Sequence, residues 1–396
     1  MAELLSIDKA QRLILANAEP LPSETVALAD AAGRVVADAA RAAIDLPPFP
    51  SSAMDGYAVR AADTPGQLRV KARIAAGKPA ADPLGPREAM GIATGGVVPD
   101  GADAVIPIEA VVEYDNEVEI GKAESGENVR PRGSDIRAGE VVVERGAVLT
   151  PARIGALAAA GVPEVRCSRR PRAAVLPTGT ELRRPGEPLE AGEIYEANGL
   201  ILAAQLEAVG AVVEALPAVG DEEAAHRGAL EQALEADLVV TSGGVSVGPH
   251  DLVRRVEAEL GVQEVFWRVS VKPGKPIAFG VRGRTLVFGL PGNPVSALVG
   301  FLLFVGPAVL ALQGVPEPLP RFDQGRLVGG RRRNPERDEL VRARLRQSAD
   351  GPLLEPLSGQ ESHMIARSAE ADALVFVARG EGELVNGQPV EYLRLT

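Results

Sequence analysis

The sequence predicts a multidomain α/β protein whose central part, residues 170–316, is a three-layer α/β domain. From residue 170 on, apolar runs typical of buried strands, such as PRAAVLPTG and DLVVTSGG, alternate with helix-like segments such as EEAAHRGALEQALEA. This alternation indicates a mainly parallel sheet between two layers of helices. Ligands of such sheets bind beyond the carboxyl ends of the strands, so we expect the functional loops to lie there.

Smaller domains are expected on both sides of this one, because 396 residues exceed what a single hydrophobic core supports. Helix-start signals at Ser6 and Thr150 frame short apolar runs cut by Gly and Pro, which are typical of a small β domain. The proline-rich stretch GVPEPLP precedes a last set of strand-like runs. We therefore divide the chain into a helical linker domain (1–41 and 133–169), a β insertion domain (42–132), the α/β domain (170–316) and a small C-terminal β-barrel domain (317–396).

The composition excludes several classes of function. A formal net charge of −12 with 3% aromatic residues argues against a nucleic-acid or membrane-surface role. The single cysteine, Cys167, excludes an internal disulfide and a thiolate metal cluster. The three histidines lack the spacing of a zinc site. Any metal should therefore be a hard cation held by carboxylates.

The sequence also indicates a cytoplasmic protein. The N-terminal segment MAELLSIDKAQRLIL lacks the basic start and small-residue cleavage pattern of a signal peptide. The most apolar stretch, Val295 to Leu312, is interrupted by two glycines and a proline. We expect it to form a buried helix rather than a membrane span.

A glycine-rich turn is the strongest local signal for a ligand. The segment VVTSGGVSVGPHD runs from a buried strand through paired glycines into a helix. Glycines allow positive φ angles that turn N–H groups toward one point, and a helix N-terminus adds partial positive charge. The alternative is a tight turn without a ligand. The residues expected to bind an anion here are Ser242, Gly243, Gly244, Ser246 and Gly248.

Three acidic residues follow strands of the same domain: Glu181, Asp221 and Asp251. Carboxylates that converge on one rim of a sheet can hold Mg²⁺ against phosphate oxygens. Taken singly, each is more often a helix cap or a solvated loop acid. Their common placement after strands is the reason to expect a metal site.

Positive charge is concentrated in the segment RVSVKPGKP, which carries Arg268, Lys272 and Lys275. Prolines beside the lysines restrain the loop, which a merely solubilising lysine does not need, and such lysines can act as point charges for phosphate or an oxyanion. The next loop, LPGNP, places Pro291 and Pro294 in a stiff turn suited to a flat heterocycle.

The β insertion contains two loops that do not resemble plain hairpins. One carries Asp55 in the segment PPFPSSAMDGYAV, and the other, GENVRPRGSD, clusters Arg130, Arg132 and Asp135. A structural network of Arg–Asp pairs remains the alternative to a binding role for these residues.

Taken together, these segments resemble the MoeA family, which includes the E domain of gephyrin. The resemblance covers essentially the whole chain, with SSAMDGYAV, ATGGVVPDGADAVIP, GENVRPRGSDI, SGGVSVGPHD, VKPGKP and GLPGNPVSA in family order. It implies a molybdopterin-binding α/β domain like MoaB and MogA, and a homodimer whose active sites are shared between subunits. It also implies adenylylated molybdopterin and molybdate as substrates, Mg²⁺ as cofactor and AMP as product.

The family pattern can be carried onto individual positions of this sequence. It suggests Asp55, Thr94, Arg130 and Asp135 on the side that the partner subunit contributes. It suggests Glu181, Asp221, Asp251, Lys272, Pro291 and Pro294 in the α/β domain, and Arg342 and Ser362 in the terminal domain. Two departures stand out: Arg268 replaces a common lysine, and PTGTEL replaces the frequent TGDEL while retaining Glu181.

Two other functions are compatible with parts of the chain. The enzyme of the preceding step, which adenylylates molybdopterin, resembles the α/β domain alone. A docking scaffold is the second alternative, although scaffolding needs none of the acids Asp55, Glu181, Asp221 and Asp251. The adenylyltransferase and acceptor molybdoenzymes are the expected partners, and the sequence does not distinguish molybdate from tungstate.

Overall fold

Six strands of the α/β domain form one sheet. They are β13 (Arg172–Pro177), β16 (Val212–Ala215), β17 (Leu238–Ser242), β18 (Gln263–Trp267), β20 (Ala278–Arg282) and β21 (Thr285–Leu290). The computed structural model describes residues 4–75, 77–244 and 252–395. The strand order is β16-β13-β17-β21-β20-β18, in which the first four strands are parallel and β20 is antiparallel to both neighbours. A separate pair is formed by β14 (Leu182–Arg183) and β15 (Ile194–Tyr195).

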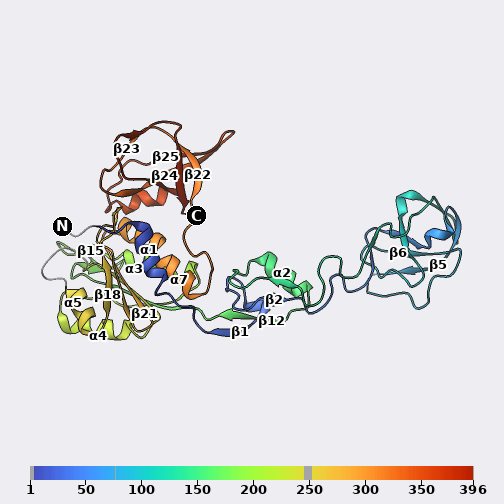
Figure 1. The fold of residues 1–396 in the computed structure, drawn as a ribbon, viewed down its shortest axis with the longest axis horizontal. Helices are drawn as coiled ribbons and strands as arrows, with labels where there is room; N and C mark the ends of the chain where they lie inside the picture. Colours follow the sequence, from blue (N-terminus) through green and yellow to red (C-terminus); the bar gives the residue numbers. More distant parts are fainter. Residues whose placement is uncertain (1–3, 76, 245–251, 396) are drawn as a thin grey trace. The chain divides into compact units, whose positions relative to one another are not determined.

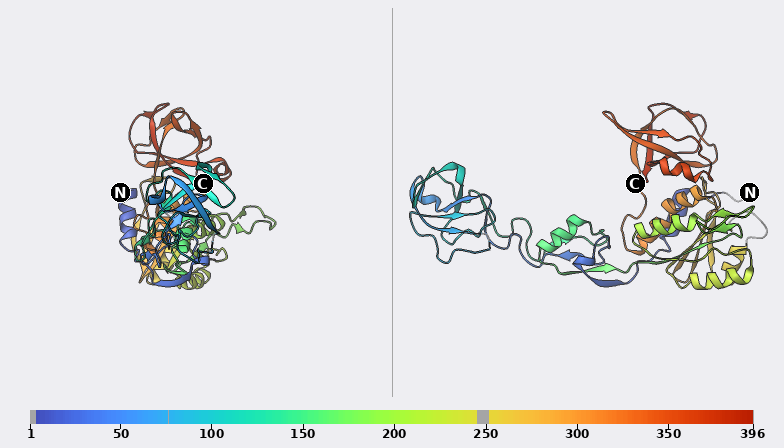
Figure 2. Two further views of the ribbon diagram at one scale, coloured as in Figure 1. Left: turned by 90° about the vertical axis from the view of Figure 1, so that its right-hand side faces the viewer. Right: turned by 180° about the vertical axis from the view of Figure 1, so that it is seen from behind.

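Helices cover both faces of this sheet (Figures 1 and 2). Side chains along β13 alternate between the faces: Ala173 and Val175 join one apolar core, and Ala174 and Leu176 join the other. The first core includes residues of α1 (Ile7–Leu15), α3 (Asn198–Ala208), α6 (Pro294–Gly300) and α7 (Gly306–Leu312). The second includes residues of α4 (Glu223–Ala233) and α5 (Leu252–Glu259). The predicted three-layer α/β domain is confirmed.

The most apolar segment is a core helix of this domain. A π-helical turn, Phe301–Val305, joins α6 to α7, so that the helix runs continuously over Pro294–Leu312. By length and composition it could cross a membrane, but 78% of it is buried inside the protein. Its side chains pack in the core shared with α1 and α3. The predicted buried helix is confirmed.

The C-terminal domain is a small closed barrel, as predicted. Its strands are β22 (Asp323–Leu327), β24 (Asp338–Ser348), β25 (Gly351–Pro356), β26 (Ala373–Val377) and β28 (Pro389–Arg394). The barrel closes because the long strand β24 pairs with both β25 and β26. The short strands β23 (Arg331–Arg332) and β27 (Glu383–Leu384) form a side pair. A strand from the α/β domain, β19 (Val271–Lys272), joins the barrel sheet by parallel pairing with β24.

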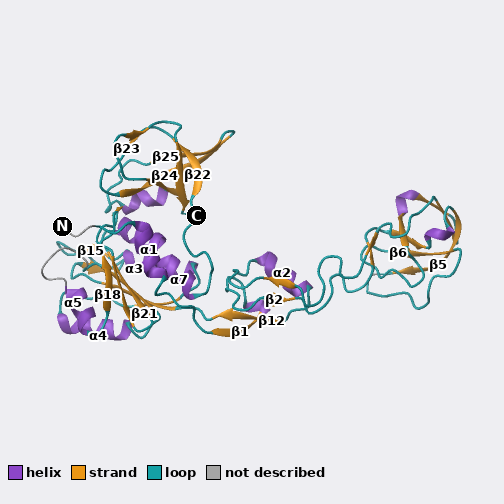
Figure 3. Cartoon of the chain, in the orientation of Figure 1, coloured by secondary structure: helices purple, strands orange, loops and turns teal. Residues whose placement is uncertain are grey.

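The chain divides into two compact units, residues 25–167 and the remainder. The linker part of the first unit contains α2 (Pro151–Ala159) and two strand pairs, β1 (Ser23–Ala27) with β12 (Glu164–Ser168) and β2 (Ala40–Arg41) with β11 (Val141–Val143). Thr150 caps α2, as its sequence predicts. The linker is therefore less helical than we expected, because short paired strands form most of its regular structure (Figure 3).

The β insertion is built on a six-stranded sheet of order β7-β4-β6-β5-β9-β8. These strands are β4 (Gly56–Val59), β5 (Gly66–Ile74), β6 (Glu88–Ile92), β7 (Ala104–Pro107), β8 (Val111–Glu113) and β9 (Glu117–Ile120). The remaining pair is β3 (Ser51–Ser52) with β10 (Val129–Arg130). Two small apolar clusters form its core, so a β domain is present where the sequence predicts one.

The first residues of the chain do not belong with the linker. We expected residues 1–41 to form part of the linker domain, but the described residues 4–24 lie in the unit that contains the α/β domain. Helix α1 begins at the predicted cap, Ser6, and buries Ile7, Ala10 and Ile14 in the core of the α/β domain. The apolar face of α1 is thus buried in the core of the α/β domain. No local sequence signal indicates which domain would bury it.

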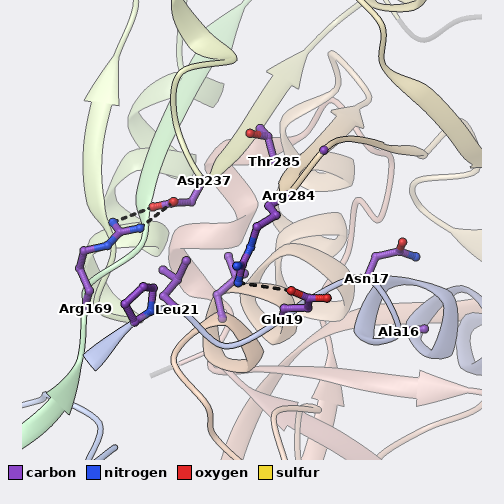
Figure 4. Close-up of a pocket in the computed structure, with 11 residues that line it drawn as sticks. Ala16, Asn17, Glu19, Leu21, Arg169, Asp237, Arg284 and Thr285 are labelled. Atoms are coloured by element: carbon purple, nitrogen blue, oxygen red, sulfur yellow. Dashed lines mark hydrogen bonds and ion pairs between the residues drawn. The ribbon is translucent and has the colours of Figure 1, made fainter. Parts of the chain in front are cut away.

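A cavity of about 330 Å³ opens at the amino ends of the sheet strands, near the start of β13, β17 and β21. Figure 4 shows Arg169 facing Asp237, and Arg284 facing Glu19, on its wall. Two nitrogens of Arg169 donate to Asp237 at 2.8 and 2.9 Å, and the Arg172 amide donates to the same carboxylate at 2.7 Å. Because both guanidinium groups face carboxylates, we regard this cavity as structural.

The Asp237 carboxylate should stabilise the protein in a pH-dependent way. Burial favours its neutral form, but the hydrogen bonds from Arg169 and Arg172 outweigh burial and lower its pKa below the usual 3.8. Asp237→Asn should cost about 1.5–3 kcal/mol near neutral pH, the range for hydrogen bonds to charged groups. The folded pKa is depressed, so this contribution is fully present well above the unfolded value of 3.8 and is lost as the pH falls through the folded value. Urea unfolding at pH 7 and at pH 3.5 measures it, and an equal loss at both values would contradict the assignment.

Candidate active site

The predicted site residues of the α/β domain gather at one edge of the sheet. Strands β13, β17 and β21 are parallel, so their carboxyl ends meet at this edge, which we call the carboxyl edge. Strand β18 runs in the same direction, because two antiparallel steps separate it from β21. The ends of these strands and the segments that follow them carry Glu181, Ser242, Gly243, Gly244, Arg268, Lys272, Lys275, Pro291 and Pro294, and Asp221 follows the neighbouring parallel strand β16. The residues Ser246, Gly248 and Asp251 lie outside the described residues.

The glycine-rich turn connects three strand ends. Gly243 and Gly244 have φ angles of 98° and 65°, and a Cβ on Gly243 would lie 2.5 Å from the Thr178 carbonyl oxygen. The Thr178 amide donates to the Ser242 carbonyl at 2.8 Å, and the Gly243 amide donates to the Leu290 carbonyl at 3.0 Å. The Gly243 amide is thus used within the protein. The backbone N–H of Gly243 is therefore not available to an anion at this turn. If the turn binds an anion, as its sequence predicts, other N–H groups have to hold it.

Asn198 connects this turn to the LPGNP loop, a role that the sequence did not reveal. Asparagine often caps a helix, but here Ala197 occupies the cap position and Asn198 is the first residue of α3. The Asn198 side-chain Nδ2 donates to Ser242 Oγ at 2.7 Å and to the Gly292 carbonyl at 2.8 Å. Its Oδ1 is buried and has no hydrogen-bond partner among the residues that the structure describes. Asn198 therefore holds the two turns together.

The carboxylates Glu181 and Asp221 lie on adjacent loops. The Gly179 amide donates to the Val219 carbonyl at 2.9 Å, which joins the two loops just before these acids. The Glu181 carboxylate folds over Gly179, where an added Cβ would lie 2.6 Å from its oxygen. Both acids are exposed, and neither forms a salt bridge with another residue that the structure describes. Their oxygens are therefore free to bind a cation.

The lysine loop carries two different environments. Lys272 Nζ lies 2.7 Å from Glu339 Oε1 of the barrel, whereas Lys275 is exposed and has no salt bridge among the described residues. Arg268, at the start of the loop, has a φ angle of 76° and stacks its guanidinium 3.7 Å above the ring of Trp267. A planar guanidinium suits this stacking better than an ammonium group. Arginine at this position is thus explained by its neighbour.

The barrel reaches the carboxyl edge through a second loop. Asn293 Nδ2 donates to Ser362 Oγ at 2.9 Å, and the Val295 amide donates to the Ser362 carbonyl at 3.1 Å. Ser362 therefore lies beside the LPGNP turn, as expected for a site residue.

Arg342 occupies a different position from the one that we expected. It is 1% exposed, and its guanidinium donates to the carbonyls of Gly359, Glu361 and Met364 and to Ser368 Oγ. All these acceptors belong to the loop that contains Ser362. Arg342 is thus buried, and its guanidinium supports the segment that contains Ser362.

In the β insertion, three of the four predicted residues come together. The Thr94 amide donates to Asp55 Oδ1 at 2.6 Å, and Arg130 pairs in register with Ser51, which also bridges to Val97. Asp135 lies further along, where its amide bonds to the Leu46 carbonyl. The neighbouring Arg132 pairs with Asp45 at 2.6 Å, so the structural alternative holds for that arginine.

Comparison with known proteins identifies the family. Three family models match in order: the MoeA N-terminal region (domain I and II) at residues 5–161, the probable molybdopterin binding domain at 174–311, and the MoeA C-terminal region (domain IV) at 324–395. The molybdopterin molybdenumtransferase of Haemophilus influenzae is 40% identical over 78% of this chain and 78% of its own length. This chain belongs to the MoeA family. The predicted resemblance is confirmed.

Further relatives span nearly the whole chain. A molybdopterin molybdenumtransferase of Staphylococcus aureus is 30% identical over 98% of this chain and 95% of its own length. A crystal structure of the molybdopterin biosynthesis MoeA protein from Pyrococcus horikoshii is 30% identical, with a TM-score of 0.82 over 100% of both chains. A second structure from that organism is 26% identical, with a TM-score of 0.86 over 99% of this chain and 100% of that one. This chain therefore has the multidomain MoeA fold.

The two hydrogen bonds of Asn198 should stabilise the carboxyl edge. Asn198→Ala removes both donors from a buried position, so we expect a loss of about 1–3 kcal/mol in unfolding free energy. Faster amide exchange should follow at Gly243. Urea unfolding and hydrogen exchange measured by mass spectrometry check the two effects. Asn17→Ala is the control, because that side chain donates once, to the Leu13 carbonyl, away from this edge. Equal effects of the two substitutions would contradict the role of Asn198.

Proposed function

We propose that this protein inserts molybdate into adenylylated molybdopterin with release of AMP, which completes the molybdenum cofactor. The observation that carries the proposal is the carboxyl edge of the domain that matches the molybdopterin-binding model. This edge combines a glycine turn, two unpaired carboxylates and a loop with two lysines. Anhydride cleavage and oxyanion binding need these groups.

The donor set at the carboxyl edge fits Mg²⁺. Glu181 and Asp221 offer hard oxygen ligands on adjacent loops, and the lack of a Cβ on Gly179 leaves room for the Glu181 carboxylate. With Asp251, they would hold the ion, which would neutralise negative charge at the pyrophosphate. The protein itself has to orient the anhydride and exclude water, so positioning should supply most of the rate acceleration.

The lysine loop would bind the second substrate. Molybdate is a dianion, and the chain carries a net charge of −12, so cations have to be concentrated where molybdate binds. Lys272 and Lys275 present two ammonium groups from one restrained loop, and Arg268 stands at its start. In this step a molybdate oxygen attacks the adenylyl phosphorus, the P–O bond of the anhydride breaks, and AMP leaves with that oxygen. The two dithiolene thiols bind the molybdenum that has lost the oxygen and release two protons.

We further propose a cytoplasmic homodimer in which each active site is shared between subunits. Asp55, Thr94 and Arg130 would come from the β insertion of one subunit and face the carboxyl edge of the other. The hydrogen bond from Thr94 to Asp55 supports a common role for these residues. The adenylyltransferase that supplies the substrate and the acceptor molybdoenzymes are the proposed transient partners.

One assay separates this function from its rivals. Purified protein is incubated with adenylylated molybdopterin, molybdate and Mg²⁺, and both AMP release and reconstitution of an apo-molybdoenzyme are measured. Adenylylation of molybdopterin from ATP, without molybdate-dependent AMP release, would identify the enzyme of the preceding step. Absence of both activities in a folded dimer would leave the scaffold function.

Substitution of Lys272 tests the molybdate subsite. Lys272→Ala should raise the apparent KM for molybdate by roughly 10- to 100-fold, which corresponds to the loss of one charge-assisted hydrogen bond. Binding of the adenylylated pterin should change less, because its adenylate end is held elsewhere. Lys9→Ala, which removes an exposed lysine from α1, is the charge-matched control. An unchanged molybdate KM together with lost nucleotide binding would assign Lys272 to the phosphates instead.

Mixing two inactive variants tests the shared site. Asp55→Ala and Asp221→Ala homodimers should both be inactive. If each site combines Asp55 of one subunit with Asp221 of the other, a mixed dimer has one intact site and one doubly defective site. Random exchange should therefore restore roughly a quarter of wild-type activity. Heterodimer formation is verified with differently tagged chains, and confirmed heterodimers without activity would place both acids in the site of a single subunit.

A further inference from the structure

A buried carboxylate lies behind the lysine loop. Glu339, near the start of β24, is 4% exposed, and its two oxygens contact different cations. Lys272 Nζ lies 2.7 Å from Oε1, and an Arg331 nitrogen lies 3.1 Å from Oε2. Arg331 comes from the barrel, whereas Lys272 comes from the α/β domain. The three side chains form a cluster with a net charge of +1.

Packing alone does not explain this arrangement. A buried carboxylate loses hydration, and a hydrophobic residue of similar volume often serves stability as well or better. Burial of Glu339 favours its neutral form, but the hydrogen bonds from Lys272 and Arg331 outweigh it and lower the pKa of the carboxyl. Glu339 is therefore charged at neutral pH. Of its two cationic partners, Lys272 is the more exposed, with 46% of its side chain accessible.

The backbone around Glu339 restrains the same loop. Lys272 and Glu339 are partners in the parallel pairing of β19 with β24. The Asp338 amide donates to the Ser270 carbonyl at 3.2 Å, and Ser270 Oγ donates to the Glu336 carbonyl at 2.8 Å. The strand that enters the lysine loop is thus part of the barrel sheet. Strand pairing with the barrel therefore fixes the position of the loop backbone. The contact with Glu339 fixes the position of the Lys272 side chain.

We propose that Glu339 is a positioning residue, which holds the Lys272 ammonium group at the carboxyl edge and sets the local charge that molybdate meets. This inference rests on the proposed function, in which Lys272 binds the oxyanion. Glu339 acts through Lys272 and does not touch the substrate. Its negative charge limits how strongly the loop attracts an anion, and its fixed oxygen limits where the ammonium group can be.

Competitive acylation of lysines tests the contact without any catalytic assay. An ammonium group bonded to a carboxylate has to give up that contact before it reacts, whereas Lys275 of the same loop is an internal reference. In Glu339→Gln, acylation of Lys272 relative to Lys275 should rise roughly tenfold, which corresponds to about 1.4 kcal/mol of lost hydrogen bonding. Mass spectrometry of the full-length protein measures the ratio. An unchanged ratio would overturn the proposal.

Two variants separate positioning from loss of structure. Ser270→Ala removes the bond to the Glu336 carbonyl and the bond from Arg379 next to the pairing of β19 with β24 but leaves every charge in place, so it should lower the unfolding temperature without changing the acylation ratio. Glu339→Asp keeps the charge on a shorter side chain and should restore part of the protection. If Ser270→Ala raises the ratio as much as Glu339→Gln does, the protection comes from backbone docking, and Glu339 has no positioning role.

A double-mutant cycle on molybdate-dependent AMP release connects the contact to function. As a single substitution, Glu339→Gln should lower kcat roughly tenfold. The apparent KM for molybdate should stay constant or fall, because a negative charge near the anion is removed. In the Lys272→Ala background the same substitution should have no further effect, whereas independent effects would overturn the proposal. A wild-type protein without AMP release would refute the proposed function, and the acylation ratio would still decide the role of Glu339.

Discussion

Parallel alignment of the central strands is the constraint on which the α/β domain depends. Strands β13, β17 and β21 bury both faces between helices, so their polar residues can emerge only where the strands end. The bonds from Thr178 to Ser242 and from Gly243 to Leu290 then hold the three ends together. Asn198 adds a side-chain connection across the same edge. Residues that are 44 to 94 positions apart in the sequence thereby become neighbours.

Electrostatics gives the second level of organisation. An acidic chain that binds anionic substrates has to separate its positive charges from its negative ones. In this chain the acids and the lysines of the carboxyl edge lie on different loops. The carboxylates of Glu181 and Asp221 form no salt bridge with another described residue. The lysine loop, in contrast, contacts the buried carboxylate of Glu339, which balances part of its positive charge. The barrel therefore contributes to the carboxyl edge of the α/β domain, because Glu339 and the loop that contains Ser362 both contact residues there.

Several elements could be predicted because their signals are local. Ser6 and Thr150 cap helices where their sequences indicate, and the alternation after residue 170 forms a three-layer domain. The role of Asn198 could not be predicted, because the same residue type can cap a helix or cross-link two turns, and only the positions of Ser242 and Gly292 decide between them. Helix α1 was placed in the wrong domain, since an apolar face does not specify which core will bury it.

The sequence by itself determined the family, the order of the domains and the loops that carry Glu181, Asp221, Lys272 and Lys275, because motifs and periodicity are properties of contiguous residues. Only the tertiary structure decided which partner each side chain has. Arg342 turned inward to support a loop, Arg268 stacked on Trp267, and Lys272 met Glu339 from another domain. Such pairings depend on how separate domains pack, and a charged residue does not encode the position of the distant group that neutralises it.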